Sequence, residues 1–80
     1  MRRNGFLVQN NNTENMIFDY RDIVSYVSKM FTLKPGDLIF TGTPEGIIQG
    51  SKEEDRVWLH TGDCLEVSIE GLGSLVNRIV

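Results

Sequence analysis

The sequence predicts a β-rich α+β chain with one amphipathic helix. Apolar residues recur at helical spacing over residues 20–31, whereas residues 65–70 alternate between apolar and polar types at strand spacing. Glycine-containing turns, such as Gly71-Leu72-Gly73, separate the remaining short apolar runs. Because 80 residues suffice for one small domain at most, we treat residues 1–80 as a single segment.

The helix is predicted by a single apolar stripe and by the residues at its ends. Asp19 is a suitable N-cap, and Pro35-Gly36 fits the two central positions of a type II turn that stops the helix. The positions of the stripe follow a period of 3.6 residues, which places them on one face. They are Tyr20, Ile23, Val24, Val27, Met30 and Phe31.

Four segments have the composition of strands. Residues 6–9 follow an Asn4-Gly5 turn, and residues 37–41 read as a buried strand. Residues 65–70 predict a strand with one solvent-exposed face, because Leu65, Val67 and Ile69 alternate with polar residues. Residues 74–80 are expected to pair antiparallel with that strand. Such a hairpin is marginal alone, so we expect more sheet to pack beside it.

Composition excludes several classes of protein. A net charge of −3 argues against nucleic-acid binding, which requires clustered Lys and Arg. No apolar run approaches 18 residues and no signal peptide is evident, so we expect no membrane segment and a cytoplasmic location. Cys64 is the single cysteine, which rules out an intrachain disulfide and a cysteine-rich zinc site.

The loop Thr41-Gly42-Thr43-Pro44-Glu45-Gly46 is the main candidate binding site. Its glycines allow backbone N–H groups to approach an anion, and a Thr hydroxyl can add a directed hydrogen bond to a carboxylate. The same residues are also compatible with a plain turn after a strand, in which Gly and Pro serve only the geometry. Spacing alone leaves both interpretations open.

Other chemically active side chains are expected to be structural. His60, the one histidine, follows Leu59 at a turn and lacks an evident partner for general-base catalysis. The acidic run at residues 53–55 is interpreted as a solvated loop, because neighbouring side chains point apart. Cys64 is expected to be a core or half-buried thiol and Trp58 a packing residue.

Six short segments in register resemble the C-terminal part of the fumarylacetoacetate hydrolase family, over nearly the whole chain. The branch is the one with acylpyruvate hydrolases, oxaloacetate decarboxylases and the 2-hydroxyhepta-2,4-diene-1,7-dioate isomerases. The segments are Asn4-Gly5 with Gln9, Thr13-x-x-Met16-Ile17-Phe18, Leu33-Lys34-Pro35-Gly36-Asp37, Thr41-Gly42-Thr43-Pro44-x-Gly46, Gly62-Asp63 and Glu70-Gly71-Leu72-Gly73.

The resemblance implies a mixed β-roll catalytic domain, usually dimeric, with bound Mg²⁺ or a similar cation such as Mn²⁺ or Ca²⁺. It implies substrates that are 2-oxo or 1,3-dicarbonyl carboxylates, with the cation stabilising enolate charge. Thr43 matches the family's substrate-contacting threonine, and Gly42 would let the backbone come close. The family's metal ligands and catalytic histidine lie before the matching part, and Glu45, Glu53 and Asp63 do not replace them. We therefore assign no catalytic and no metal-binding residue to this chain.

Two functions follow as alternatives. In the first, the chain is a C-terminal segment of such an enzyme, separated from the rest by truncation, a split gene or a misplaced start, and is inactive alone. In the second, it is a non-catalytic folded module that binds a partner chain. A segment of the first kind is expected to need its missing N-terminal part or to form a homo-oligomer.

Overall fold

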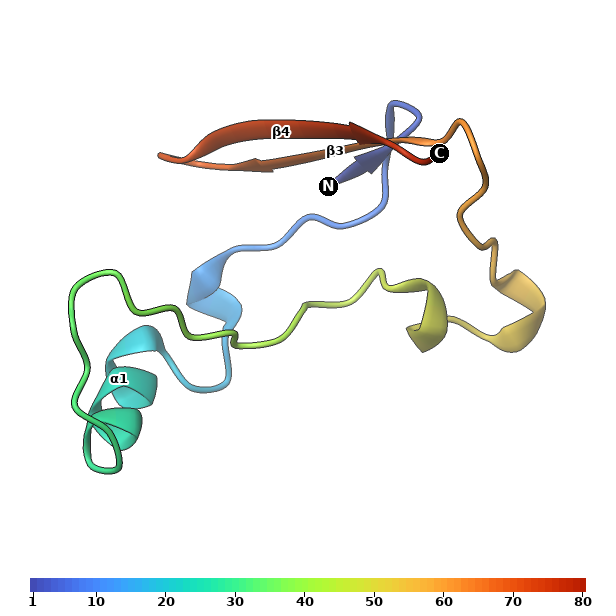
Figure 1. Ribbon diagram of the computed structural model, residues 1–80. Helices are drawn as coiled ribbons and strands as arrows, with labels where there is room; N and C mark the ends of the chain where they lie inside the picture. The colour runs from blue at the N-terminus through green and yellow to red at the C-terminus, as the bar shows by residue number, and fades with distance from the viewer. The chain divides into compact units, whose positions relative to one another are not determined.

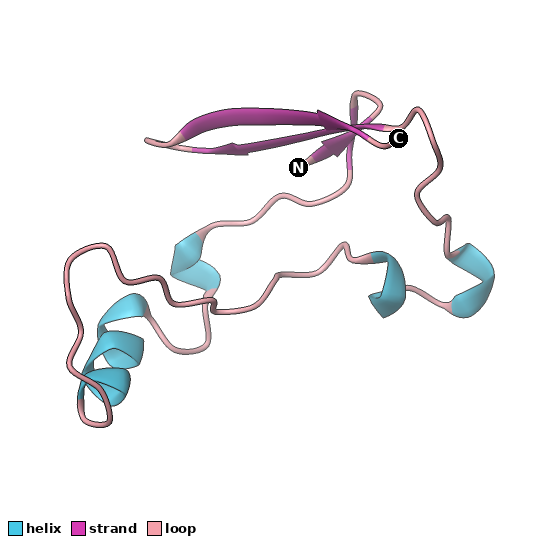
Figure 2. Cartoon of the chain, viewed as in Figure 1, coloured by secondary structure: helices cyan, strands magenta, loops and turns pink.

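The structure, a computed structural model, describes residues 1–80 and divides into two compact units. One unit combines Met1–Asn10 with Thr43–Val80 and contains the sheet, and the other is Asn11–Gly42 and contains the α-helix. Figure 1 shows the path of the chain through these elements, and Figure 2 shows that loops connect most of them. The combination of one α-helix with a sheet confirms the predicted α+β, β-rich class.

The sheet has four strands in the order β2-β1-β3-β4, and every neighbouring pair is antiparallel. The strands are β1 (Arg2–Arg3), β2 (Phe6–Leu7), β3 (Cys64–Ile69) and β4 (Gly73–Arg78). The β3–β4 hairpin, at the red end of Figure 1, confirms the predicted antiparallel pairing. The mixed β-roll stays a prediction, because these strands pair only in antiparallel fashion.

The register of the hairpin sorts its residues onto two faces. Val67 lies opposite Leu75, so these two residues and Ile69 share one face. Glu66 and Ser68 lie on the other face, as the alternation predicts. The apolar face is open, since the exposed fraction is 39% for Val67, 56% for Ile69 and 62% for Leu75.

Helix α1 spans Tyr20–Ser28, with the predicted N-cap. The Asp19 carboxylate accepts a hydrogen bond of 2.9 Å from the backbone N–H of Asp22, which satisfies one of the free donors of the first turn. The helix ends earlier than the apolar stripe predicts. The N–H groups of Met30 and Phe31 both point to the Val27 carbonyl, so the last part of the stripe closes a turn.

The predicted type II turn is confirmed. Gly36 has φ +94°, and the N–H of Asp37 donates to the Lys34 carbonyl at 3.0 Å across the turn. The prediction of a buried strand at residues 37–41 is wrong. Leu38 and Phe40 are 83% and 94% exposed, and no other strand of the chain pairs with this segment. A strand needs a hydrogen-bonding neighbour, which an apolar sequence run cannot provide by itself.

Short 3-10 turns lie at Thr13–Asn15, Ile48–Gly50 and Glu53–Asp55, the last of them in the acidic run that was predicted to be a loop. No side chain of the chain is fully buried, and the large apolar side chains are largely accessible. The elements are thus held by local turns, sheet pairing and polar contacts more than by a core. None of the helices is long and apolar enough to cross a membrane.

Candidate functional site

The side chain of Gln9, two residues after the end of β2, contacts the Thr43 loop. The Gln9 amide nitrogen donates to Thr43 Oγ1 at 2.9 Å. The same nitrogen lies 3.3 Å from both the Pro44 and the Glu45 carbonyl oxygens. One amide group thus contacts three consecutive residues of the loop, within the unit that contains the sheet.

Gly46 brings the end of this loop into close contact with the residues that follow β2. Its φ is +99°, a conformation that L-amino acids with a Cβ rarely adopt. A Cβ added at this position would lie 2.3 Å from the Val8 carbonyl oxygen and 2.8 Å from Gln9 Cγ. Both glycine properties, positive φ and absence of a side chain, are therefore required here.

Thr43 is exposed and carries the hydroxyl that the sequence analysis selected. Gly42, the other predicted contact residue, has φ +93°, and an added Cβ would meet no atom within 4 Å. Its backbone is therefore open to approach by a ligand. These facts are compatible with the predicted substrate contacts of Thr43 and Gly42, which stay predictions.

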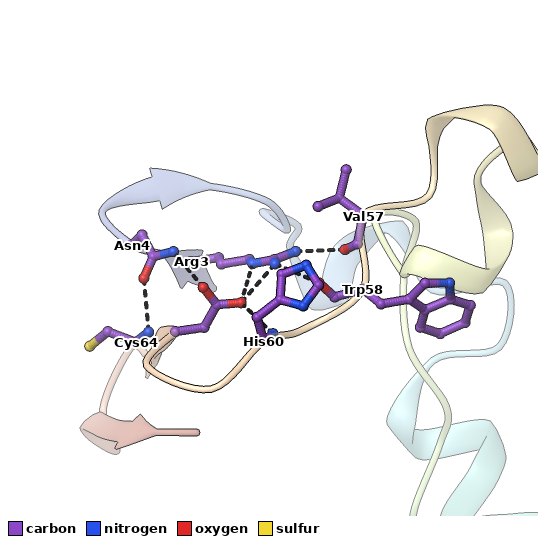
Figure 3. A network of polar contacts seen from close by, with 7 residues as sticks. Arg3, Asn4, Val57, Trp58, His60 and Cys64 are labelled. Carbon is purple, nitrogen blue, oxygen red and sulfur yellow. Dashed lines mark hydrogen bonds and ion pairs between the residues drawn. The ribbon is translucent and has the colours of Figure 1, made fainter. Parts of the chain in front are cut away.

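A second polar cluster surrounds Asp63, and Figure 3 shows Arg3, Asn4 and His60 in this cluster. Arg3 makes an ion pair of 2.7 Å with Asp63 and also donates to the carbonyls of Val57 and Trp58 at 2.6 and 2.7 Å. Asn4 donates to Asp63 at 2.9 Å. The cluster joins two parts of the sequence that lie far apart, namely residues 3–4 and residues 57–63.

These contacts favour the charged form of Asp63. Hydrogen bonds from the His60 backbone N–H and the Asn4 side chain, together with the Arg3 guanidinium, lower the pKa of Asp63 from 3.8 to about 2. The backbone bond comes from a tight turn, in which the Asp63 N–H also donates to the His60 carbonyl. Asp63 is thus an anionic anchor whose two oxygens are occupied by donors of this chain.

Of the remaining candidates, His60, the acidic run and Cys64 agree with the expectations from sequence, and Trp58 does not. His60 is exposed and bonds through its backbone, and Figure 3 shows its ring with no hydrogen bond drawn to it. Glu53–Asp55 forms an exposed 3-10 turn, and Cys64 is a partly exposed free thiol. Trp58 is 55% exposed, so within this chain it is not the packing residue that was predicted.

No three His, Cys, Asp or Glu side chains lie close enough together to hold a metal ion. Sequence reasoning missed Gln9, Gly46 and the Arg3–Asp63 pair as structural partners. Gln9 and Arg3 carry no local signal, because their partners are 34 to 60 residues away along the chain. Gly46 could have been suspected, since glycine after a Pro-x pair often marks a residue with positive φ.

The family model described as fumarylacetoacetate (FAA) hydrolase C-terminal matches residues 1–80. The chain belongs to the fumarylacetoacetate hydrolase family. This match confirms the resemblance carried by the six segments. No solved structure matches the chain.

Curated relatives within the family are similar over nearly all of this chain. A fumarylacetoacetate hydrolase domain-containing protein 2 homolog of Dictyostelium discoideum is 49% identical over 76 residues, which are 95% of this chain and 25% of the relative. A 2,4-didehydro-3-deoxy-L-rhamnonate hydrolase of Sphingomonas is 46% identical, with 95% and 26% covered. A mitochondrial oxaloacetate tautomerase of Rattus norvegicus is 42% identical, with 99% and 25% covered. The chain therefore spans about a quarter of the length of these relatives.

Proposed function

We propose that this chain forms the C-terminal quarter of a metal-dependent enzyme acting on 2-oxo or 1,3-dicarbonyl carboxylates. The reaction is C–C bond hydrolysis, decarboxylation or isomerisation. The observation that carries the proposal is the family match over residues 1–80, combined with the quarter share of each relative. Two of these relatives are named as a hydrolase and a tautomerase, and both names contain a carboxylate substrate.

Within such an enzyme, Thr43 is the residue of this chain that binds the substrate. Thr43 is an exposed residue of the loop, and its hydroxyl accepts a hydrogen bond from Gln9. The preceding residue, Gly42, leaves room for a carboxylate to reach the backbone N–H groups. A hydroxyl and open backbone amides together suit the recognition of an anion.

The Mg²⁺, Mn²⁺ or Ca²⁺ ion of such an enzyme does not fit the residues of this chain. Hard cations of this kind need several oxygen ligands that converge on one point. No such convergence of acidic side chains exists here, and Asp63 already accepts from Arg3, Asn4 and His60. The ligands are therefore assigned to the part of the enzyme that precedes this segment, and the chain alone is predicted to be inactive.

The alternative, a non-catalytic module that binds a partner, has less support. An independent module of 80 residues needs a core, a metal or disulfides of its own. No side chain here is fully buried, and the single cysteine is free. The exposed apolar side chains are instead the surface expected of a segment that packs on the rest of a larger domain. Homo-oligomer formation and a cytoplasmic location stay predictions.

The proposal is tested with a chimera of the Dictyostelium relative, in which this chain replaces the matched segment of 76 residues. The purified chimera is assayed with Mg²⁺ against oxaloacetate and a panel of acylpyruvates. We expect turnover of at least one of these carboxylates, which Thr43→Ala weakens. A folded chimera that binds Mg²⁺ and converts no member of the panel would refute the proposed function.

A further inference from the structure

We propose that Gln9 is a positioning residue that turns the Thr43 hydroxyl into a hydrogen-bond donor directed at the substrate carboxylate. This inference rests on the proposed function, because it assigns a partner to Thr43 in that same site. It adds a residue that touches no substrate and acts through another side chain. The direction of the Gln9–Thr43 hydrogen bond follows from which atoms near Gln9 can donate and which can only accept.

The orientation of the Gln9 amide is determined by two carbonyl groups. The Pro44 and Glu45 carbonyl oxygens both lie 3.3 Å from Gln9 Nε2. A carbonyl oxygen can only accept a hydrogen bond, so the atom facing them must be the nitrogen and not Oε1. The third neighbour of that nitrogen, Thr43 Oγ1 at 2.9 Å, must then accept as well.

The direction of this bond leaves the Thr43 proton available. A hydroxyl that accepts one hydrogen bond can still donate its own proton to another group. Within the chain its nearest acceptor is the Pro44 carbonyl at 3.4 Å, well beyond the ~2.7–2.8 Å typical of O–H···O bonds. Thr43 therefore keeps a proton for an external acceptor, and a carboxylate is the strongest acceptor of that kind.

Gln9 is itself held in place on both sides. Its backbone N–H donates to the Met1 carbonyl at 3.2 Å, and its carbonyl accepts from the Met1 nitrogen at 2.7 Å, which continues the β1–β2 pairing. Gly46 also lies close to the Val8 carbonyl and to Gln9 Cγ. The Gln9 side chain thus connects residues next to the sheet with the loop, as a positioning residue must.

The contact itself is tested by hydrogen exchange in the full chain. The sequence contains two glutamines, and Gln49 is an exposed internal control whose side chain makes no hydrogen bond. With ¹⁵N-labelled glutamine, we expect the Gln9 side-chain amide to exchange at least about 5-fold more slowly than that of Gln49. Equal rates in both the full chain and the chimera would overturn the proposal.

The positioning role is tested by kinetics in the chimera with Gln9→Glu, which keeps the shape but cannot donate. We expect KM for the carboxylate substrate to rise about 10- to 100-fold with kcat changed less than about 3-fold, since a charge-assisted bond is lost. KM for the methyl ester should rise less, because its neutral carbonyl accepts a weaker bond. Gln49→Glu adds the same charge elsewhere and should change neither constant.

Each further outcome has a defined meaning. If Gln9→Glu raises KM equally for the carboxylate substrate and its methyl ester, the positioning role is overturned. The same holds if Gln49→Glu raises KM as much as Gln9→Glu does. Independent effects of Gln9→Ala and Thr43→Val, which multiply in the double variant, would also overturn it, because Gln9 is argued to act through Thr43. A slowly exchanging Gln9 amide in a chimera that converts no carboxylate would refute the proposed function while supporting the Gln9–Thr43 contact.

Discussion

Gly46 lies close to the Val8 carbonyl and to Gln9 Cγ, so Gly46→Ala should displace the Thr43 loop. Two separate costs are expected. A φ of +99° is unfavourable for any residue with a Cβ, by about 1–2 kcal/mol. In addition, the new Cβ would lie 2.3 Å from the Val8 carbonyl oxygen, so the backbones must separate by roughly 1 Å to restore normal contact.

The second cost resembles overpacking in a protein interior, which typically amounts to about 1–3 kcal/mol. The total expected loss is therefore about 2–5 kcal/mol of unfolding free energy. Gly62→Ala is the matched control, because Gly62 has φ +95° in the same unit and an added Cβ there meets nothing within 4 Å. Only the first cost applies at that position.

Urea unfolding of the chimera, monitored by circular dichroism, measures the two losses side by side. We expect Gly46→Ala to exceed Gly62→Ala by about 1–3 kcal/mol. Exchange of the Gln9 side-chain amide should also become faster in Gly46→Ala alone, since Gln9 Cγ is the second atom in the way. Equal losses of unfolding free energy in the two variants would show that the positive φ accounts for the whole effect. The steric clash of the added Cβ with the Val8 carbonyl would then be refuted.

Three further predictions concern the substrate contact, the acid response and the isolated chain. Thr43→Ala should reduce kcat/KM of the chimera by an amount equivalent to about 1–3 kcal/mol, as measured by steady-state kinetics, and an unchanged value would exclude Thr43 as a contact. The pKa of Asp63 in the folded state, about 2, lies below its ordinary value of 3.8. The contribution of Asp63 to the unfolding free energy is therefore fully present above pH 3.8 and is lost as the pH falls through about 2. Asp63→Asn should flatten the dependence of the unfolding free energy on pH across that interval. The purified 80-residue chain should not convert oxaloacetate or acylpyruvates with added Mg²⁺, and metal-dependent turnover would contradict the assignment of the metal ligands to another part of the enzyme.

Features encoded within a few residues could be predicted from the sequence. The start of α1 at Asp19 depends on one side chain and the next three N–H groups. The turn at Pro35-Gly36 requires only a fixed φ followed by a positive one. The alternation in β3 and the short turn to β4 determine which residues of that hairpin share a face. Each of these signals lies inside one window of sequence, where period and residue type are informative.

The candidate site was predictable only in part. The Thr43 loop could be selected because two glycines, a proline and two hydroxyls occur together. The role of Gln9 could not, because no local pattern relates it to Thr43, which follows 34 residues later. Its sequence neighbours are an ordinary strand end and an asparagine-rich stretch, which indicate only a loop.

Six motifs in register indicated the family from the amino-acid sequence alone. The start of the helix, the hairpin and the turn at Pro35-Gly36 were also predictable, because short-range sterics and hydrogen bonding specify them. By contrast, the pairing of β1 with β3, the contacts of Arg3 and Asn4 with Asp63, and the contact of Gln9 with Thr43 became known from the folded structure. The folded structure also decided that Leu38 and Phe40 form no strand, since pairing requires a neighbour. These features join residues far apart along the chain, and the energy of such contacts depends on where the backbone brings them together.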